Sequence, residues 1–423
     1  HINEKIQPLT LSKAKLRSNK QGFYLHHIKI KNYNAALMAE LYFPVDSVNY
    51  IDVAVNNINP ANYLPDMARQ FSRGDSLNFA CKIEIGASNY IQGKFNGQLR
   101  ANPLEHGKVE ALVSENNFEI ADFSFMSGEE KIKIDFKSQA SDNYTGNIDI
   151  KNINLDKWNI VKTKTSLSGT TYFTITGKLN NPDRINAEIN FAETGVDTMN
   201  INRLTGKLSY RENVLTILDT IDCCLDENHF YVTGRTNFKS QQLNIDCLVK
   251  SPDISIFSPL LNTPGIQGSL YGKISLNGAL SNPGINGELS ADQIGIPEIF
   301  FDKTKLKFGL MNIAKNRAGS LVMQAKNGQT TYIDVPFPLL NLDMTFEDDT
   351  SNIKMLEVVG DIFALNLKGK IINFEDFLIN ELRGNLKSNQ FRNISPLRIS
   401  VVEKNINVHQ SEIAINDSRL IFA

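Results

Sequence analysis

Residues 270–280 read LYGKISLNGAL, and apolar residues or glycine at every second position alternate with mainly polar residues. Successive side chains of a β-strand point to opposite faces of a sheet, so such a strand keeps one face dry and the other wet. Strands of a parallel sheet that is covered on both sides would instead read as continuous apolar runs. This stretch therefore predicts an antiparallel sheet with one apolar face.

The same alternation recurs along most of the chain, for example in residues 131–137 and 363–371. Short polar clusters separate the runs, as expected of hairpin turns, at residues 127–130, 211–213 and 347–350. Helical signals are confined to four short segments, at residues 65–71, 156–160, 253–257 and 374–378. The segments at 156–160 and 253–257 each begin with an aspartate that can cap a helical turn. We predict an all-β fold: an elongated, curled antiparallel sheet of repeated strands, or β-groove, with a few short helical turns.

A Gly-x-Leu turn followed by Asn-Pro occurs three times, at residues 97–103, 177–182 and 278–283, and a new alternating run follows each copy. A degraded fourth copy spans residues 369–386. A chain of 423 residues is too long for one compact core, whereas units that contact only their neighbours can repeat without limit. We predict one continuous repeat array, with approximate units at 50–104, 105–184, 185–284 and 285–390, and with strands of the next unit at 391–423.

Glycine recurs on the predicted apolar face, at Gly93 and Gly97 in one strand and at Gly272 and Gly278 in another. Glycine inside a strand marks a bend, a bulge or the close approach of another group. Regular glycines would let the sheet curl tightly, which the recurrence favours, and they would equally allow a facing sheet to approach.

The residues predicted to line the groove are the apolar ones that stay in phase along each run. They are Phe79, Ile83, Ile91, Phe95, Leu99, Ile132, Ile134, Phe136, Ile148, Ile150, Phe173, Ile175, Leu179, Ile189, Val232, Leu243, Ile245, Leu270, Ile274, Leu276, Leu280, Leu289, Leu365, Leu367 and Ile371.

The composition argues against several function classes. The formal net charge is -2, whereas a nucleic-acid-binding protein normally carries a basic excess or stripe. No window holds the roughly 18 consecutive apolar residues of a membrane helix, and no signal peptide opens the chain. The first residue is His1 rather than methionine, so we expect a fragment whose membrane anchor lies outside it.

We predict no catalytic residues, no metal site and no cofactor. His26 and His27 are adjacent and would face opposite ways on a strand, and the other histidines, among them His106, His229 and His409, are isolated in the sequence. The acidic clusters at 129–130 and 347–349 lack the glycine-centred spacing of a calcium loop and are interpreted as solvated turn charges. No motif of a serine hydrolase, zinc protease or phosphate-binding loop occurs.

The four cysteines are Cys81, Cys223, Cys224 and Cys247. Cys81 and Cys247 are in phase with the apolar face and are expected to act as small buried hydrophobes. Cys223 and Cys224 are neighbours and must point to opposite faces of their strand. A structural disulfide is not expected.

The recurring apolar-x-Gly-x-Leu pattern, with its Asn-Pro turns, resembles the AsmA-like and TamB-like proteins of bacterial envelopes. Residues 204–210, 214–217 and 231–234 look like that family's strand group, and residues 340–346 with 367–369 echo it. The resemblance covers most of residues 50–390 through loose patterns. It implies a curled sheet, open on one side, that is anchored in the inner membrane, crosses the periplasm and carries phospholipids toward the outer membrane. It also implies an outer-membrane barrel of the assembly family as a partner, although the family's barrel-binding region has no match here.

Other hypotheses remain open for the apolar face. It could be the closed core of a sandwich, of a structural β-solenoid or stalk, or of an envelope assembly factor that helps outer-membrane proteins insert. An outer-membrane barrel is disfavoured because the polar face is too rich in Lys, Asp and Asn. A carbohydrate-cleaving β-helix would need clustered carboxylates on one exposed face, and the sequence has none.

Overall fold

The computed structural model describes residues 10–422, apart from 33–34, 45–46, 60–74, 100–101, 115–117, 141, 159, 180, 198, 259–262, 316, 331–335, 374, 403–404 and 410. The described residues form thirty β-strands and one short 3-10 helix, η3 (Ser255–Phe257). The strands of the described residues pair in antiparallel fashion, as the period-two alternation predicts. The prediction of an all-β antiparallel fold is therefore confirmed.

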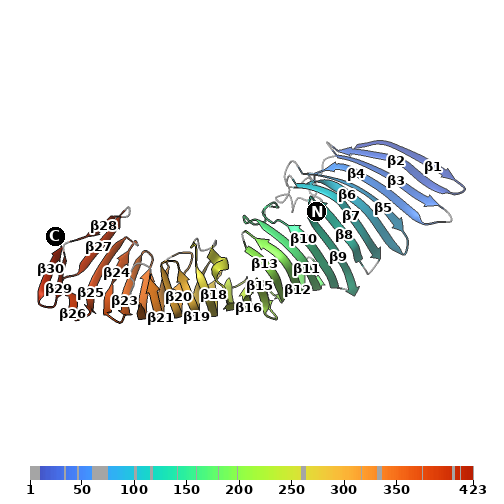
Figure 1. The fold of residues 1–423 in the computed structure, drawn as a ribbon. Helices are drawn as coiled ribbons and strands as arrows, with labels where there is room; N and C mark the ends of the chain where they lie inside the picture. The colour runs from blue at the N-terminus through green and yellow to red at the C-terminus, as the bar shows by residue number, and fades with distance from the viewer. Residues whose placement is uncertain are drawn as a thin grey trace. The chain divides into compact units, whose positions relative to one another are not determined.

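The chain divides into two compact units, His1–Glu212 and Asn213–Ala423. This division does not test the boundaries of the repeat units, which stay a prediction. In each unit, most strands pair with the strands before and after them in the chain, so that they lie side by side in sequence order (Figure 1).

The strands of the N-terminal unit are β1 (Thr10–Asn19), β2 (Gly22–Asn32), β3 (Ala35–Pro44), β4 (Asn49–Ile58), β5 (Ser76–Ile85), β6 (Ser88–Leu99), β7 (Asn102–Ser114), β8 (Phe118–Ser127), β9 (Glu130–Ala140), β10 (Asn143–Ile153), β11 (Thr165–Lys178), β12 (Asn181–Val196) and β13 (Met199–Arg211).

The strands of the C-terminal unit are β14 (Val214–Ile217), β15 (Ile221–Leu225), β16 (Asn228–Asn237), β17 (Gln242–Ser251), β18 (Gln267–Ala279), β19 (Asn282–Ile296), β20 (Ile299–Met311), β21 (Ala318–Thr330), β22 (Phe337–Glu347), β23 (Thr350–Val359), β24 (Phe363–Ile372), β25 (Asp376–Leu386), β26 (Asn389–Asn393), β27 (Leu397–Val402), β28 (Asn405–Val408), β29 (Ser411–Ile415) and β30 (Ser418–Phe422). Near the end of this unit, β25 pairs with both β26 and β27.

Each copy of the repeated Gly-x-Leu and Asn-Pro motif forms a hairpin turn. Its asparagine pairs directly with the residue that ends the preceding strand, at the β6–β7, β11–β12 and β18–β19 turns. The predicted turns at 127–130 and 347–350 are also hairpins, because Ser127 pairs with Glu130 and Glu347 with Thr350.

The predicted helical turns had mixed outcomes. Residues 253–257 include η3, and the Asp253 carboxylate accepts a hydrogen bond from the Ser255 amide at 2.9 Å. Residues 156–158 form a turn without a helix. The prediction at 374–378 is wrong, because β25 begins at Asp376 and its pairing with β24 and β27 outweighs the local propensity. Residues 65–71 lie outside the described residues.

Among the described residues, no helix has the length and apolar character needed to cross a membrane.

Candidate functional site

The strand register gathers the apolar side chains of each unit on one face, which we call the apolar face. Residues directly opposite each other in an antiparallel pair point to the same side of the sheet. In the N-terminal unit, one row of directly paired residues crosses nine strands, through Ile83, Ile91, Ala111, Ile120, Phe136, Gly146, Phe173, Ala187 and Leu208.

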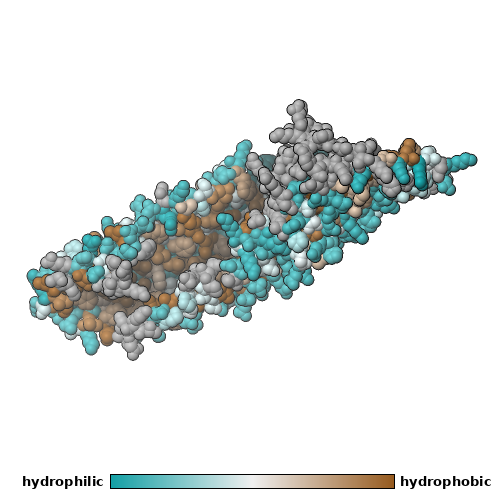
Figure 2. All heavy atoms as spheres, turned by 90° about the horizontal axis from the view of Figure 1, so that it is seen from above, coloured by the Kyte–Doolittle hydropathy of each residue, from teal (hydrophilic) through white to brown (hydrophobic). Residues whose placement is uncertain are grey.

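The C-terminal unit repeats this arrangement. A row of directly paired residues runs through Val232, Cys247, Ile274, Gly287, Phe308, Leu321, Met344, Ile353, Gly369, Ile379 and Leu397. In Figure 2, side chains coloured as hydrophobic gather in a hollow over the strands of this unit, and hydrophilic side chains follow its rims. The row is apolar or glycine at every step, so the face is continuous within the unit.

The apolar face is half-exposed rather than enclosed. Every residue predicted to line the groove is half-buried, except Leu179 and Leu289, and Leu289 is 8% exposed. A core between two packed sheets would bury such side chains almost completely. Among the described residues, no second sheet layer covers this face. The face is therefore accessible from one side along most of its strands.

Two predicted lining residues lie outside the strands. Leu179 lies in the turn after β11 and is 49% exposed, and Leu280 lies in the turn after β18, where its amide donates to the Gln241 carbonyl. The strands end one residue earlier than the alternation suggested, so the period-two pattern no longer fixes the direction of these side chains. Leu99, the corresponding residue of the first motif, still ends β6 and packs on the buried cluster described below.

Phenylalanine rings cover many of the glycines on the apolar face. A methyl group added at Gly107 would overlap the Phe95 ring, and the residue lies directly opposite Phe95. Gly287 stands in the same relation to Phe308. The sequence suggested that glycines on this face allow the sheet to curl or a facing sheet to approach. In these two pairs, the glycine instead makes room for a ring of the neighbouring strand. Gly97 differs, because it follows a β-bulge, has φ +158° and lies against the Ser76 carbonyl, which fits a local bend.

The opposite face carries cross-strand ion pairs. Lys273 contacts Asp246 at 2.9 Å and lies opposite Glu288, whose carboxylate contacts Lys307 at 2.5 Å. A hydrogen bond from Ser275 and then one from Lys273 lower the pKa of Asp246, and Lys307 lowers that of Glu288. In contrast, burial raises the pKa of the Cys247 thiol on the apolar face. The two faces of one strand thus have opposite electrostatic character.

A loop folds over one rim of the apolar face in the N-terminal unit. Residues 154–158, here called the Trp158 loop, follow β10, and Trp158 is 8% exposed beside Leu104 and Ile153. Its ring meets the Phe125 ring edge-on at 6.2 Å. The remaining partly buried side chains packed on this cluster are those of Leu77, Leu99, Ile132, Ile150, Leu155 and Leu167. Among the described residues, the Trp158 loop thus covers one end of the face over β5–β11.

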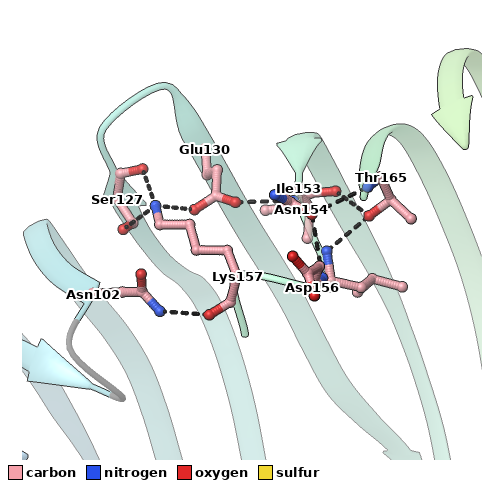
Figure 3. Close-up of polar contacts among 9 residues, drawn as sticks. Asn102, Ser127, Glu130, Ile153, Asn154, Asp156, Lys157 and Thr165 are labelled. Carbon is pink, nitrogen blue, oxygen red and sulfur yellow. Dashed lines mark hydrogen bonds and ion pairs between the residues drawn. The ribbon is translucent and has the colours of Figure 1, made fainter. Parts of the chain in front are cut away.

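Polar contacts anchor the Trp158 loop to the neighbouring turns (Figure 3). Lys157 Nζ lies 2.6 Å from Glu130 Oε2 and donates to Ser127 Oγ at 3.1 Å. The Asn154 amide donates to the other oxygen of Glu130, and the Asn102 side chain donates to the Lys157 carbonyl. Glu130 is only 6% exposed, so its interpretation as a solvated turn charge is wrong: its partner lies 27 residues away.

The C-terminal unit has an equivalent anchor between β17 and β18. Asn228 is 1% exposed, and its side-chain oxygen accepts hydrogen bonds from Ser251 Oγ at 2.6 Å and from the Asp253 amide at 3.2 Å. Ile254 is 4% exposed, and the Phe257 ring packs edge-on against Phe230 at 5.8 Å. Both loops follow a strand end and carry an aromatic side chain back over the apolar face.

The cysteine predictions are correct for the faces of the strands, although Cys81 and Cys247 are half-buried rather than buried. All four cysteines are free, Cys81 and Cys247 lie on the apolar face, and Cys223 and Cys224 point to opposite faces. The alternation in the sequence did not reveal the surroundings of His229, which contacts both Asp222 and Cys224. A prediction that residues 225–228 form a hairpin turn would have paired Cys224 with His229. The side chains of His26 and His27 lie outside the described part of the structure.

Among the described residues, no group of three or more His, Cys, Asp or Glu side chains could hold a metal ion. A scan against models of protein families finds no match for this chain, and no curated protein matches it.

Proposed function

We propose that the apolar face solvates the acyl chains of phospholipids, and that the chain is a segment of a bridge-like protein that carries lipids between the inner and outer membranes of a bacterial envelope. The observation that carries the proposal is an apolar face that is continuous through the strand register and half-exposed. Each methylene that leaves water for such a face contributes about 0.8 kcal/mol. An exposed apolar surface of this extent is typical of binding sites.

The dimensions and the lining suit an acyl chain. A ten-residue strand such as β24 spans about 33 Å, and one leaflet contributes about half of the ~30 Å hydrocarbon core of a bilayer. The lining mixes Ile, Leu, Phe and Val without a repeated polar contact, so it favours apolar chains in general over one lipid species. Charged head groups would stay at the open side, in water.

The envelope location, the inner-membrane anchor and an outer-membrane barrel partner belong to this proposal and rest on the resemblance to AsmA-like and TamB-like proteins. The segments at 204–210 and 340–346, which carry the resemblance, are both strands whose apolar residues face the same side as their neighbours. A stalk or assembly factor with a closed core is less well supported, because the described residues leave this face half-exposed.

Native mass spectrometry of the chain, purified from a bacterial host and followed by lipid extraction, tests the proposal. We expect co-purifying phospholipids on the unaltered chain and a large loss in the Ile175→Asp, Ile274→Asp double variant, because both side chains are half-buried on the apolar face. A folded, lipid-free chain, or equal lipid content in the double variant, would contradict the proposal.

The control variants belong on the opposite face. Lys273 contacts Asp246 and lies opposite Glu288, so Lys273→Asp would place three acids together and is a poor control. Tyr271→Asp is better, because Tyr271 is 40% exposed and lies opposite Lys250. Thr176→Asp is the matching control for Ile175, since Thr176 is exposed and lies opposite Arg184. Both controls should retain their lipid.

A further inference from the structure

Three side chains of the β15–β16 hairpin form a hydrogen-bonded chain on the polar face. His229 Nδ1 lies 3.2 Å from an Asp222 carboxylate oxygen, and His229 Nε2 lies 3.8 Å from Cys224 Sγ. The Asp222 oxygen can only accept, so it fixes the imidazole proton on Nδ1 and turns the Nε2 lone pair toward the thiol. This is the order of groups that activates a cysteine nucleophile: a thiol, a base and a carboxylate that orients the base.

The hairpin holds these groups in place. Cys224 and His229 are directly paired across the strands, next to the turn that Asn228 closes by donating to the Leu225 carbonyl at 3.0 Å. The Tyr231 ring stacks on the imidazole, with 5.7 Å between centroids and 7° between planes. The imidazole therefore has a fixed plane as well as a fixed tautomer.

Cys224 differs from the other three cysteines. Cys81, Cys223 and Cys247 point to the apolar face, where burial raises the pKa of each thiol and stabilises its unreactive neutral form. Cys224 is half-buried on the polar face, and the imidazole of His229 lies beside it. The neutral thiol also donates to the Asp226 carbonyl at 3.1 Å, so its proton lies between two acceptors.

We propose that Cys224 is a reactive thiol, activated by His229 and oriented through Asp222, that exchanges with small disulfides. The thiol proton passes to His229 Nε2, and the Cys224 thiolate attacks one sulfur of the disulfide. A new S–S bond forms while the old one breaks, and the departing thiolate takes the proton from His229. Cys224 and one half of the reagent are joined as a mixed disulfide, and the other half leaves as a thiol.

The surrounding charge selects among disulfides. Asp226 and Glu227 lie in the hairpin turn, Asp222 lies opposite Tyr231, and Lys250 lies opposite His229 with its ammonium 5.2 Å from the Tyr231 ring. Within the β15–β16 hairpin and β17, these three acidic side chains face the single ammonium of Lys250, so we expect a cationic disulfide to be favoured over an anionic one. Cystamine is therefore the probe of choice.

Alkylation of the full chain with iodoacetamide at several pH values, read by peptide mass spectrometry, tests this proposal. At pH 6.5 we expect Cys224 to react about fivefold faster in the unaltered chain than in His229→Gln, because the imidazole accepts the thiol proton during the attack and the glutamine side chain cannot. Asp222→Asn should reduce the rate in the same direction, and cystamine should form its mixed disulfide at Cys224 first.

The other cysteines serve as internal controls. Cys223 and Cys247 should react slowly with iodoacetamide in every variant. Rapid labelling of these two thiols would reveal that a variant is unfolded. The test then rests on the unaltered chain, in which Cys224 should react faster than Cys223 and Cys247. A Cys224 rate in the unaltered chain that is no higher than the rates of Cys223 and Cys247, or a rate that His229→Gln leaves unchanged while Cys223 and Cys247 stay slow, overturns the proposal.

Discussion

Phe308 lies directly opposite Gly287 across the β19–β20 pair, and its ring occupies the space that a Cβ at Gly287 would take. The same relation recurs on the apolar face in both units, at Gly107 with Phe95, Gly146 with Phe173, Gly169 with Phe191, Gly319 with Phe346, Gly328 with Phe337 and Gly384 with Phe391. A ring that lies over a glycine of the next strand shields backbone from water without a second layer. The face gains packing in this way while it stays open on one side.

Gly287→Ala should therefore destabilise the C-terminal unit. The three atoms nearest the added methyl are ring atoms of Phe308, so the ring must leave its position at a cost of about 1–3 kcal/mol, measured by chemical denaturation. In a Phe308→Ala background the same methyl should cost much less, which a double-mutant cycle detects. Gly86→Ala is the control, because only the Ser88 carbonyl lies near its added methyl, at 3.5 Å. Equal costs for Gly287→Ala in both backgrounds would contradict the packing role.

Lys157→Met should destabilise the Trp158 loop. Glu130 would keep its buried carboxylate but lose the ammonium 2.6 Å away, and we expect a cost of about 1–3 kcal/mol in denaturation. The expected loss of stability is smaller than for a fully buried ion pair, because the Lys157 side chain is 34% exposed.

Glu130→Gln combined with Lys157→Met should recover part of this loss, since the buried charge is then removed. Glu129→Gln in the same turn changes an exposed residue and should have almost no effect. A similar cost for Glu129→Gln and Lys157→Met would mean that the ion pair does not anchor the loop.

The Asp246 carboxylate should give a pH-dependent contribution to stability. Ser275 and Lys273 lower its pKa in the folded chain, so this contribution is present above the unfolded value near 3.9 and is lost as the pH falls through the folded value. Asp246→Asn should lower the Tm at pH 7 by no more than about 3 °C, because the pair is solvent-exposed. The difference from the unaltered chain should shrink below pH 4 in thermal unfolding scans. A constant difference from pH 7 to pH 3 would exclude this linkage.

The faces of the strands could be predicted from the sequence because the period of a strand is two. Ile274 and Leu367 lie where the alternation places them. Leu179 and Leu280 could not be placed, since the alternation carries no information on where a strand ends. The partners of Glu130 and the covering of Gly287 by Phe308 depend on contacts between strands, which one segment of sequence does not reveal.

Photolabelling tests the open apolar face most directly. The full chain is incubated with a phospholipid that carries a diazirine on its acyl chain, irradiated and digested, and the labelled residues of β18 and β24 are mapped by mass spectrometry. We predict label on alternating residues, at Ile274 and Leu276 and at Leu365 and Leu367, and little label at Lys273, Ser275, Asn366 and Lys368, which point to the other face. Equal labelling of both faces, or none on either strand, would contradict an apolar face that receives acyl chains.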